Sequence, residues 1–121
     1  MPESTAGQTH DELDEQIATT VARGEAYTLV LLWAGPHRDQ EEVEQDRLQQ
    51  AHLRHLFGLR NAGKLLMNGP VLDDSDLVGI AIFAGDDLDE VRALAEADPS
   101  VQAGRMRVDA RPLFAIPGDS I

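Results

Sequence analysis

Two short, wholly apolar segments constrain the fold of this chain more than any other feature of its sequence. Residues 27–34 (YTLVLLWA) and 77–84 (LVGIAIFA) are each too short for a typical buried helix. The first of them ends at Gly35-Pro36, which is a natural stop. Such runs are typical of strands that are buried on both faces. A sheet built around these two strands therefore needs a cover on each side.

Capping signals delimit two predicted helices between and after these strands. The first helix is expected to begin after Asp39, with Glu42 three residues further on as in a capping box, and to run to Ala62. The second is expected to begin after Asp87 and to run to about Asp98, where the following proline blocks its continuation. Both helices are long enough to cross one face of a sheet.

Two further strands complete the pattern. Residues 64–68 form a predicted strand closed by Gly69-Pro70, and residues 105–116 alternate between apolar and charged side chains. The order is then strand, helix, strand, strand, helix, strand, which is the α+β, ferredoxin-like βαββαβ arrangement. Right-handed crossovers place both helices on one face of a four-stranded antiparallel sheet. Because the other face would be bare and apolar, we expect a homodimer.

The first 24 residues are expected to form an N-terminal extension to a main domain that spans residues 25–121. Residues 1–9 are small and polar and are predicted to be disordered. An extra helix is predicted over residues 11–23, with a frayed, solvated tail as the alternative. The prediction of this helix is based on three apolar residues at four-residue spacing: Leu13, Ile17 and Val21.

Charge and composition argue against several classes of protein. The chain has 22 acidic and 10 basic residues and a net charge of −12, so neither a nucleic acid nor an anionic membrane surface is an expected partner. The lack of cysteine excludes a disulfide scaffold, cysteine-ligated metals and thiol catalysis. No apolar run approaches the roughly 20 residues of a membrane span, and the N-terminus does not resemble a signal peptide. We therefore expect a cytoplasmic protein.

His52 is the first residue that is out of place for a purely structural role. It lies with His55 on the apolar face of the first predicted helix, where a leucine would be ordinary. A half-buried histidine there is a hydrogen-bonded core residue, a metal ligand or a general acid–base. No third ligand is evident near the two histidines, so no metal site is predicted.

Asp98 is the second unusual residue. It falls on the apolar stripe of the second predicted helix, in the last turn, where the helix dipole disfavours a carboxylate. The alternative is a turn residue that binds backbone N–H groups before Pro99. The predicted topology allows Asp98 and His52 to meet above the sheet, and a carboxylate that fixes an imidazole tautomer is the smallest general acid–base device.

Five short fragments occur in order along the chain: His52-Leu53, Gly63-Lys64-Leu65-Leu66, Gly69-Pro70, Ala97-Asp98-Pro99 and Ala103-Gly104. Taken together, they resemble the YCII-related domain family over residues 27–116. Pro112-Leu113-Phe114 departs from the family's terminal Pro-Phe by an inserted leucine. The resemblance implies a dimeric α+β barrel whose candidate catalytic residues are a His–Asp pair, here His52 and Asp98.

The resemblance also implies a function. The family includes a dehydrochlorinase of a chlorinated hydroxyquinol, and its fold resembles that of muconolactone isomerase. This favours a lyase or isomerase that carries out proton transfer, elimination or isomerisation on a small cyclic or enolic metabolite without a cofactor. We expect His55, Gly69 and Pro70 to line the substrate pocket. A non-catalytic small-metabolite-binding or accessory dimer is the alternative.

Overall fold

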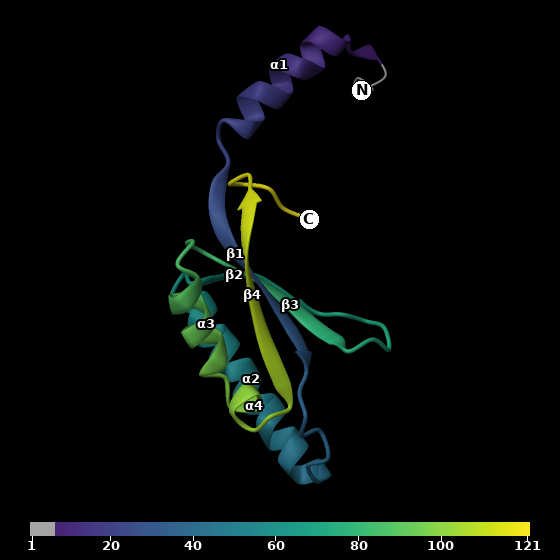
Figure 1. The fold of residues 1–121 in the computed structure, drawn as a ribbon, viewed down its shortest axis with the longest axis vertical. Helices are drawn as coiled ribbons and strands as arrows, with labels where there is room; N and C mark the ends of the chain where they lie inside the picture. Colours follow the sequence, from purple (N-terminus) through teal and green to yellow (C-terminus); the bar gives the residue numbers. More distant parts are fainter. Residues whose placement is uncertain (1–6) are drawn as a thin grey trace. The chain divides into compact units, whose positions relative to one another are not determined.

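The expected succession of strands and helices is present in residues 7–121, which the computed structural model describes (Figure 1). The α+β, ferredoxin-like class is confirmed, and a helix precedes the first strand. The expectation for residues 1–6 lies outside the described residues. The elements are α1 His10–Val21, β1 Glu25–Ala34, α2 Glu42–Asn61, β2 Leu65–Pro70, β3 Leu77–Phe83, α3 Leu88–Glu96, α4 Pro99–Gln102 and β4 Met106–Ala115.

The chain divides into two compact units. One comprises Tyr27–Leu113 and holds α2, α3, α4 and most of the sheet. The other is made by the residues before Tyr27 and after Leu113. Within that second unit, Thr9 caps α1 in a capping box with Glu12, so Thr9 is part of an ordered helix start and not of a disordered tail. No residue of α1 is buried.

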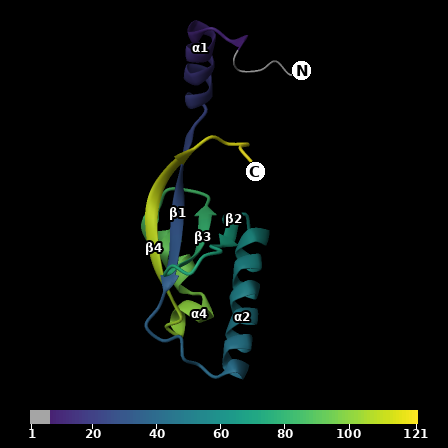
Figure 2. The ribbon, with the colours of Figure 1, turned by 90° about the vertical axis from the view of Figure 1, so that its right-hand side faces the viewer.

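The four strands form one antiparallel sheet in the order β2-β3-β1-β4. In its centre Val30 of β1 lies opposite Ala81 of β3, and Ala81 in turn lies opposite Asn68 of β2. Figure 2 shows α2 alongside one face of this sheet. Leu56 of α2 and Val91 of α3 belong to the same buried cluster as Val30 and Ala81, so both helices cover the same face.

Only one face of the sheet is buried in this chain. Alternate residues of β1, namely Thr28, Val30 and Leu32, are buried beneath the helices, whereas the intervening residues Leu29 and Leu31 are half-buried. The same alternation runs along β3. Both faces of β1 and β3 are therefore apolar, but the helices of a single chain cover only one of them. Among helices in residues 7–121, none has both the length and the apolar character that a membrane span requires.

The predicted start of α2 is wrong by two residues. Asp39 does not cap the helix, which begins at Glu42 after an extended Glu41 (φ −62°, ψ 155°). The reason is a set of contacts from distant residues. Arg105 Nη1 donates to Gln40 Oε1 at 2.7 Å, and the Gln40 amide donates to Ala103 O at 3.4 Å. These bonds hold the chain before Glu42 in a non-helical loop.

The predicted end of the second helix is also wrong. α3 ends at Glu96, and Asp98 is instead the N-cap of α4, where its Oδ1 accepts from Ser100 N at 2.9 Å. Pro99 occupies the first turn of α4, a position that suits its missing N–H. Asp98 therefore lies at the positive end of a helix, and the turn alternative is right. The predicted cap at Asp87 is confirmed, since its side chain accepts from Glu90 N at 3.1 Å.

Candidate active site

His52 lies on α2 between two residues that enter the core. Leu48 and Leu56, about one turn before and after it, are buried. Because residues four apart share a helix face, the His52 ring is directed to the same side, at the edge of the core. Its side chain is 13% exposed, so the imidazole is nearly buried yet still accessible.

The His52 ring is hydrogen-bonded to the carboxylate of Asp98. His52 Nδ1 contacts Asp98 Oδ2, and the other carboxylate oxygen accepts from Ser100 N. Asp98 is only 2% exposed. The predicted pairing of these two residues is therefore present. The hydrogen bond from Ser100 N, which caps α4, fixes the Asp98 carboxylate in this position. Ser100 Oγ also donates to Leu48 O at 3.3 Å, which packs α4 against α2.

This pairing decides which nitrogen of His52 is available for chemistry. A carboxylate at Nδ1 favours the tautomer with its proton on that nitrogen, which leaves Nε2 as the basic atom. Within residues 7–121, the hydrogen bond of the His52 ring is the one that Nδ1 makes. An imidazole in this tautomer can accept a proton at Nε2.

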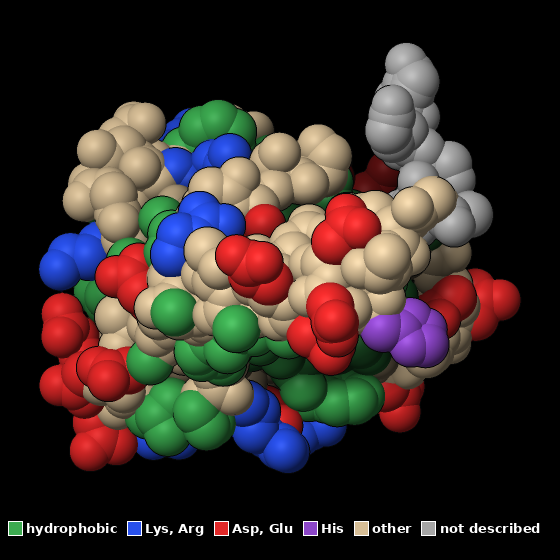
Figure 3. All heavy atoms as spheres, turned by 90° about the horizontal axis from the view of Figure 1, so that it is seen from above, with side chains coloured by type: hydrophobic (Ala, Val, Ile, Leu, Met, Phe, Trp, Pro, Cys, Tyr) green, Lys and Arg blue, Asp and Glu red, His purple; other side chains and the backbone are tan. Residues whose placement is uncertain are grey.

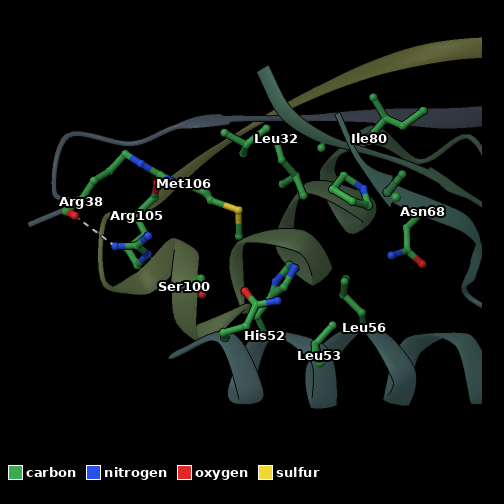
Figure 4. A pocket seen from close by; sticks show the side chains of 16 residues that line it. Leu32, Arg38, His52, Leu53, Leu56, Asn68, Ile80, Ser100, Arg105 and Met106 are labelled. Atoms are coloured by element: carbon green, nitrogen blue, oxygen red, sulfur yellow. Dashed lines mark hydrogen bonds between the residues drawn. The ribbon is translucent and has the colours of Figure 1, made fainter. Parts of the chain in front are cut away.

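His52 lines a pocket of about 330 Å³ between α2 and the sheet (Figure 4). Gly69 and Pro70, at the end of β2, line it as well. Asp98 does not line it but lies behind the His52 ring. The walls are mostly apolar, and polar groups enter from several elements. The other lining residues are Leu32, Arg38, Gln49, Leu53, Leu56, Asn68, Val78, Gly79, Ile80, Ala81, Ser100, Arg105 and Met106.

His55 is not among the residues that line this pocket. Its Nε2 lies 2.8 Å from Leu94 O, so the ring links α2 to α3 through the backbone of α3. This places His55 on the core side of α2, as predicted from the helical periodicity, but in contact with a neighbouring helix. The hydrogen bond to Leu94 O accounts for a polar residue at position 55, so no bound ligand is needed to explain it.

The two arginines of the pocket, Arg38 and Arg105, were not predicted from the sequence. Arg38 follows β1 and Arg105 precedes β4, and the topology brings the two loops together. A weak signal exists for Arg105, because it directly follows Ala103-Gly104 of the family pattern. Nothing in the sequence near Arg38 indicates its partner 67 residues away.

Two glycines explain how closely these loops approach. Gly35 N donates to Arg105 O at 2.7 Å, and a side chain at Gly35 would place its Cβ 2.2 Å from Gly104 O. Gly104 has a φ of +80°, in the left-handed region that favours glycine. The His37 side chain packs against Gly104 at a position where a Cβ would not fit. The junction therefore requires glycine on both sides.

Over residues 7–121, no group of three or more His, Asp or Glu side chains is placed to hold a metal ion. The polar groups of the pocket are one imidazole, two guanidinium groups, amides and a hydroxyl. Such a set suits an organic ligand with an apolar body and a few polar substituents.

The fold and the site define a small α+β protein with a histidine–carboxylate pair beside a pocket. The YCII-related domain matches residues 28–112, so the chain belongs to the YCII-related domain family. A similar solved structure is that of 5-chloro-2-hydroxyhydroquinone dehydrochlorinase from Burkholderia phenoliruptrix in complex with 2,5-dihydroxybenzoquinone. It is 27% identical, with a TM-score of 0.48, and the match covers 69% of this chain and 90% of that chain. The comparison with curated proteins gave no match.

Proposed function

We propose that this protein is a small-molecule enzyme in which His52 is the general acid–base and Asp98 is its positioning residue. The observation that carries the proposal is the His52 ring itself. Its Nδ1 is bonded to a buried carboxylate, while the ring lines a pocket of ligand size. A histidine that served packing alone would have no need of a buried charge behind it.

The reaction that suits this pair is proton transfer next to a carbonyl group. His52 Nε2 takes a proton from the carbon beside the carbonyl, and the C–H electron pair forms an enolate. In an isomerisation the imidazolium returns the proton to another carbon. In an elimination the electron pair forms a C=C bond and expels a leaving group from the adjacent carbon. Neither sequence requires a cofactor, and the Asp98 carboxylate stabilises the imidazolium in both.

The pocket favours a small cyclic or enolic metabolite as the substrate. Its volume of about 330 Å³ is near the lower end of the range of roughly 300–1,000 Å³ for small-molecule sites. Leu32, Leu56 and Met106 provide apolar walls, and Asn68 provides a polar group at one end (Figure 4). A single ring with oxygen substituents matches this size and lining.

We also propose that two chains associate through the face of the sheet that the helices leave uncovered. Leu29 and Leu31 on β1 and Ile80 and Ile82 on β3 are half-buried on that face. A contiguous apolar sheet face is a typical interaction surface, and a second copy of the same face is self-complementary.

The catalytic proposal is tested by proton exchange on a model ring. The full chain is incubated in D2O with α-angelica lactone, and deuterium uptake and double-bond migration are followed by NMR. We expect His52→Ala to abolish the enzyme-dependent rate and Asp98→Asn to lower it at least about a hundredfold. His55→Gln is the matched control. It should stay close to the unchanged protein, because the glutamine amide can still donate to Leu94 O.

An exchange rate that survives His52→Ala would overturn the proposed role of His52. The alternative, a metabolite-binding protein without turnover, predicts a different result. Small cyclic ketones and lactones would then shift the NMR signals of the pocket, while none of them would exchange protons faster than in buffer.

A further inference from the structure

We propose that the metabolite bound in this pocket carries a carboxylate, which Arg38 and Arg105 hold at the end of the pocket opposite Asn68 (Figure 4). The inference deepens the proposed function by naming the substrate class for the same site. It concerns binding, so it is testable without knowledge of the reaction.

Arg38 and Arg105 have no carboxylate partner among residues 7–121. Four of the basic side chains form ion pairs, with Glu44, Asp89, Asp109 and Glu90. In the described part of the chain, neither Arg38 nor Arg105 forms one. Two guanidinium groups beside one pocket repel each other, and an anion between them would offset that repulsion.

The two arginines are held in place, but their hydrogen-bond donors are not all used. Arg38 Nη1 donates to Arg105 O at 2.5 Å, and Arg105 Nη1 donates to Arg38 O at 3.2 Å and to Gln40 Oε1 at 2.7 Å. These bonds use one terminal nitrogen of each guanidinium. Each group has five N–H donors in a planar fork, so donors remain for a carboxylate, which matches the fork in geometry.

The surrounding backbone fixes the two guanidinium groups relative to each other. Gly35 N and Arg38 Nη1 donate to the same Arg105 carbonyl oxygen. The close packing of Gly35 on Gly104 leaves no room for the loops to shift inward. A pair of donors held in this way needs little reorganisation when a ligand binds.

The net charge of the whole chain is strongly negative, at −12. With 22 acidic and 10 basic residues, the protein as a whole repels anions. Acidic side chains occur in several places on the face shown in Figure 3, and basic ones are fewer. The pocket is a local exception, because two arginines and no acidic residue line it, and an anionic ligand accounts for this lining.

The position of the two arginines also orients the ligand. Ser100 and Met106 lie between the arginines and the centre of the pocket in Figure 4, and His52 lies on its floor. A carboxylate bound at the arginine end directs the attached ring over Met106 and toward the His52 imidazole. The carboxylate thus orients the ring without taking part in the proton transfer.

The experiment compares salicylate with salicylamide, which share a ring and a phenol and differ only in the carboxylate. Binding to the full chain is followed by NMR shifts of the Met106 methyl group and the His52 ring. We expect salicylate to bind about tenfold more tightly than salicylamide, as charge-assisted hydrogen bonds would give. Arg38→Gln and Arg105→Gln should each remove most of this preference, and Arg105→Lys should restore part of it.

Arg54→Gln is the matched control, because Arg54 is exposed on α2 and does not line the pocket. It should keep the full preference for salicylate. Equal binding of the two probes, no binding of salicylate at millimolar concentration, or a preference that survives both glutamine variants would overturn the inference. His52→Ala should still prefer salicylate. Loss of proton exchange in that variant bears on the proposed function alone, so the two failures are distinguishable.

Discussion

At the scale of single residues, Asp98 carries two tasks that the sequence presented as alternatives. It caps α4 through Ser100 N, and it binds the His52 ring. The two tasks use different oxygens of one carboxylate. A turn residue and a positioning residue are therefore the same residue here. The buried carboxylate is stable at this position because both of its oxygens have partners.

This double role predicts different effects for two substitutions. Asp98→Ala removes the cap and leaves the His52 ring without its partner, so the free energy of unfolding should fall by about 1–3 kcal/mol. Asp98→Asn keeps a side-chain oxygen for Ser100 N and should cost less than about 1 kcal/mol. Urea unfolding followed by circular dichroism measures both. Equal losses in the two variants would show that the cap contributes nothing.

At the scale of elements, the junction between the end of β1 and the start of β4 depends on Gly35. An added Cβ would lie 2.2 Å from Gly104 O and 2.8 Å from Met106 N, which are both backbone atoms. Gly35→Ala should therefore push the two loops apart and lower the free energy of unfolding by about 1–3 kcal/mol. It should also weaken salicylate binding, because Arg38 and Arg105 would separate. Thermal melting and the NMR titration measure the two effects.

Gly58→Ala is the control for this substitution. Gly58 lies within α2, and a Cβ there would meet nothing within 4 Å. Alanine should raise the stability by about 1 kcal/mol, because glycine is the poorer helix former. A Gly35→Ala protein as stable as the unchanged chain would mean that the junction is looser than its contacts indicate.

At the scale of the whole molecule, the proposed dimer predicts the mass in solution. Sedimentation at micromolar concentration should give about twice 13.2 kDa. Leu31→Glu places a charge in the centre of the uncovered sheet face and should give monomers, because a buried unpaired charge is costly. Val43→Glu, at a position that is 81% exposed on α2, should leave the dimer intact. A monomeric unchanged chain would remove the proposed interface.

The order of the elements and the fold class could be predicted from the amino-acid sequence. Apolar runs, alternation and stop signals are local properties, so they are legible in 27–34, 77–84 and the segments between them. The cap at Asp87 and the unusual placement of His52 could be recognised for the same reason. The Asp87 cap follows a capping rule, and His52 departs from the apolar pattern of its helix face. Both the rule and the pattern involve only nearby residues in the sequence.

The start of α2, the position of Asp98 at the start of α4 and the pairing of Arg38 with Arg105 depend on the three-dimensional fold. Long-range contacts set all three. Arg105 holds Gln40 outside the helix that was predicted to begin after Asp39. Asp98, which was predicted in the last turn of one helix, is instead the N-cap of the next. Hydrogen bonds that join residues 46 or 67 positions apart in the chain leave no periodic pattern in the sequence. The pocket exists because these contacts bring three separate segments together, and local propensity does not record such contacts.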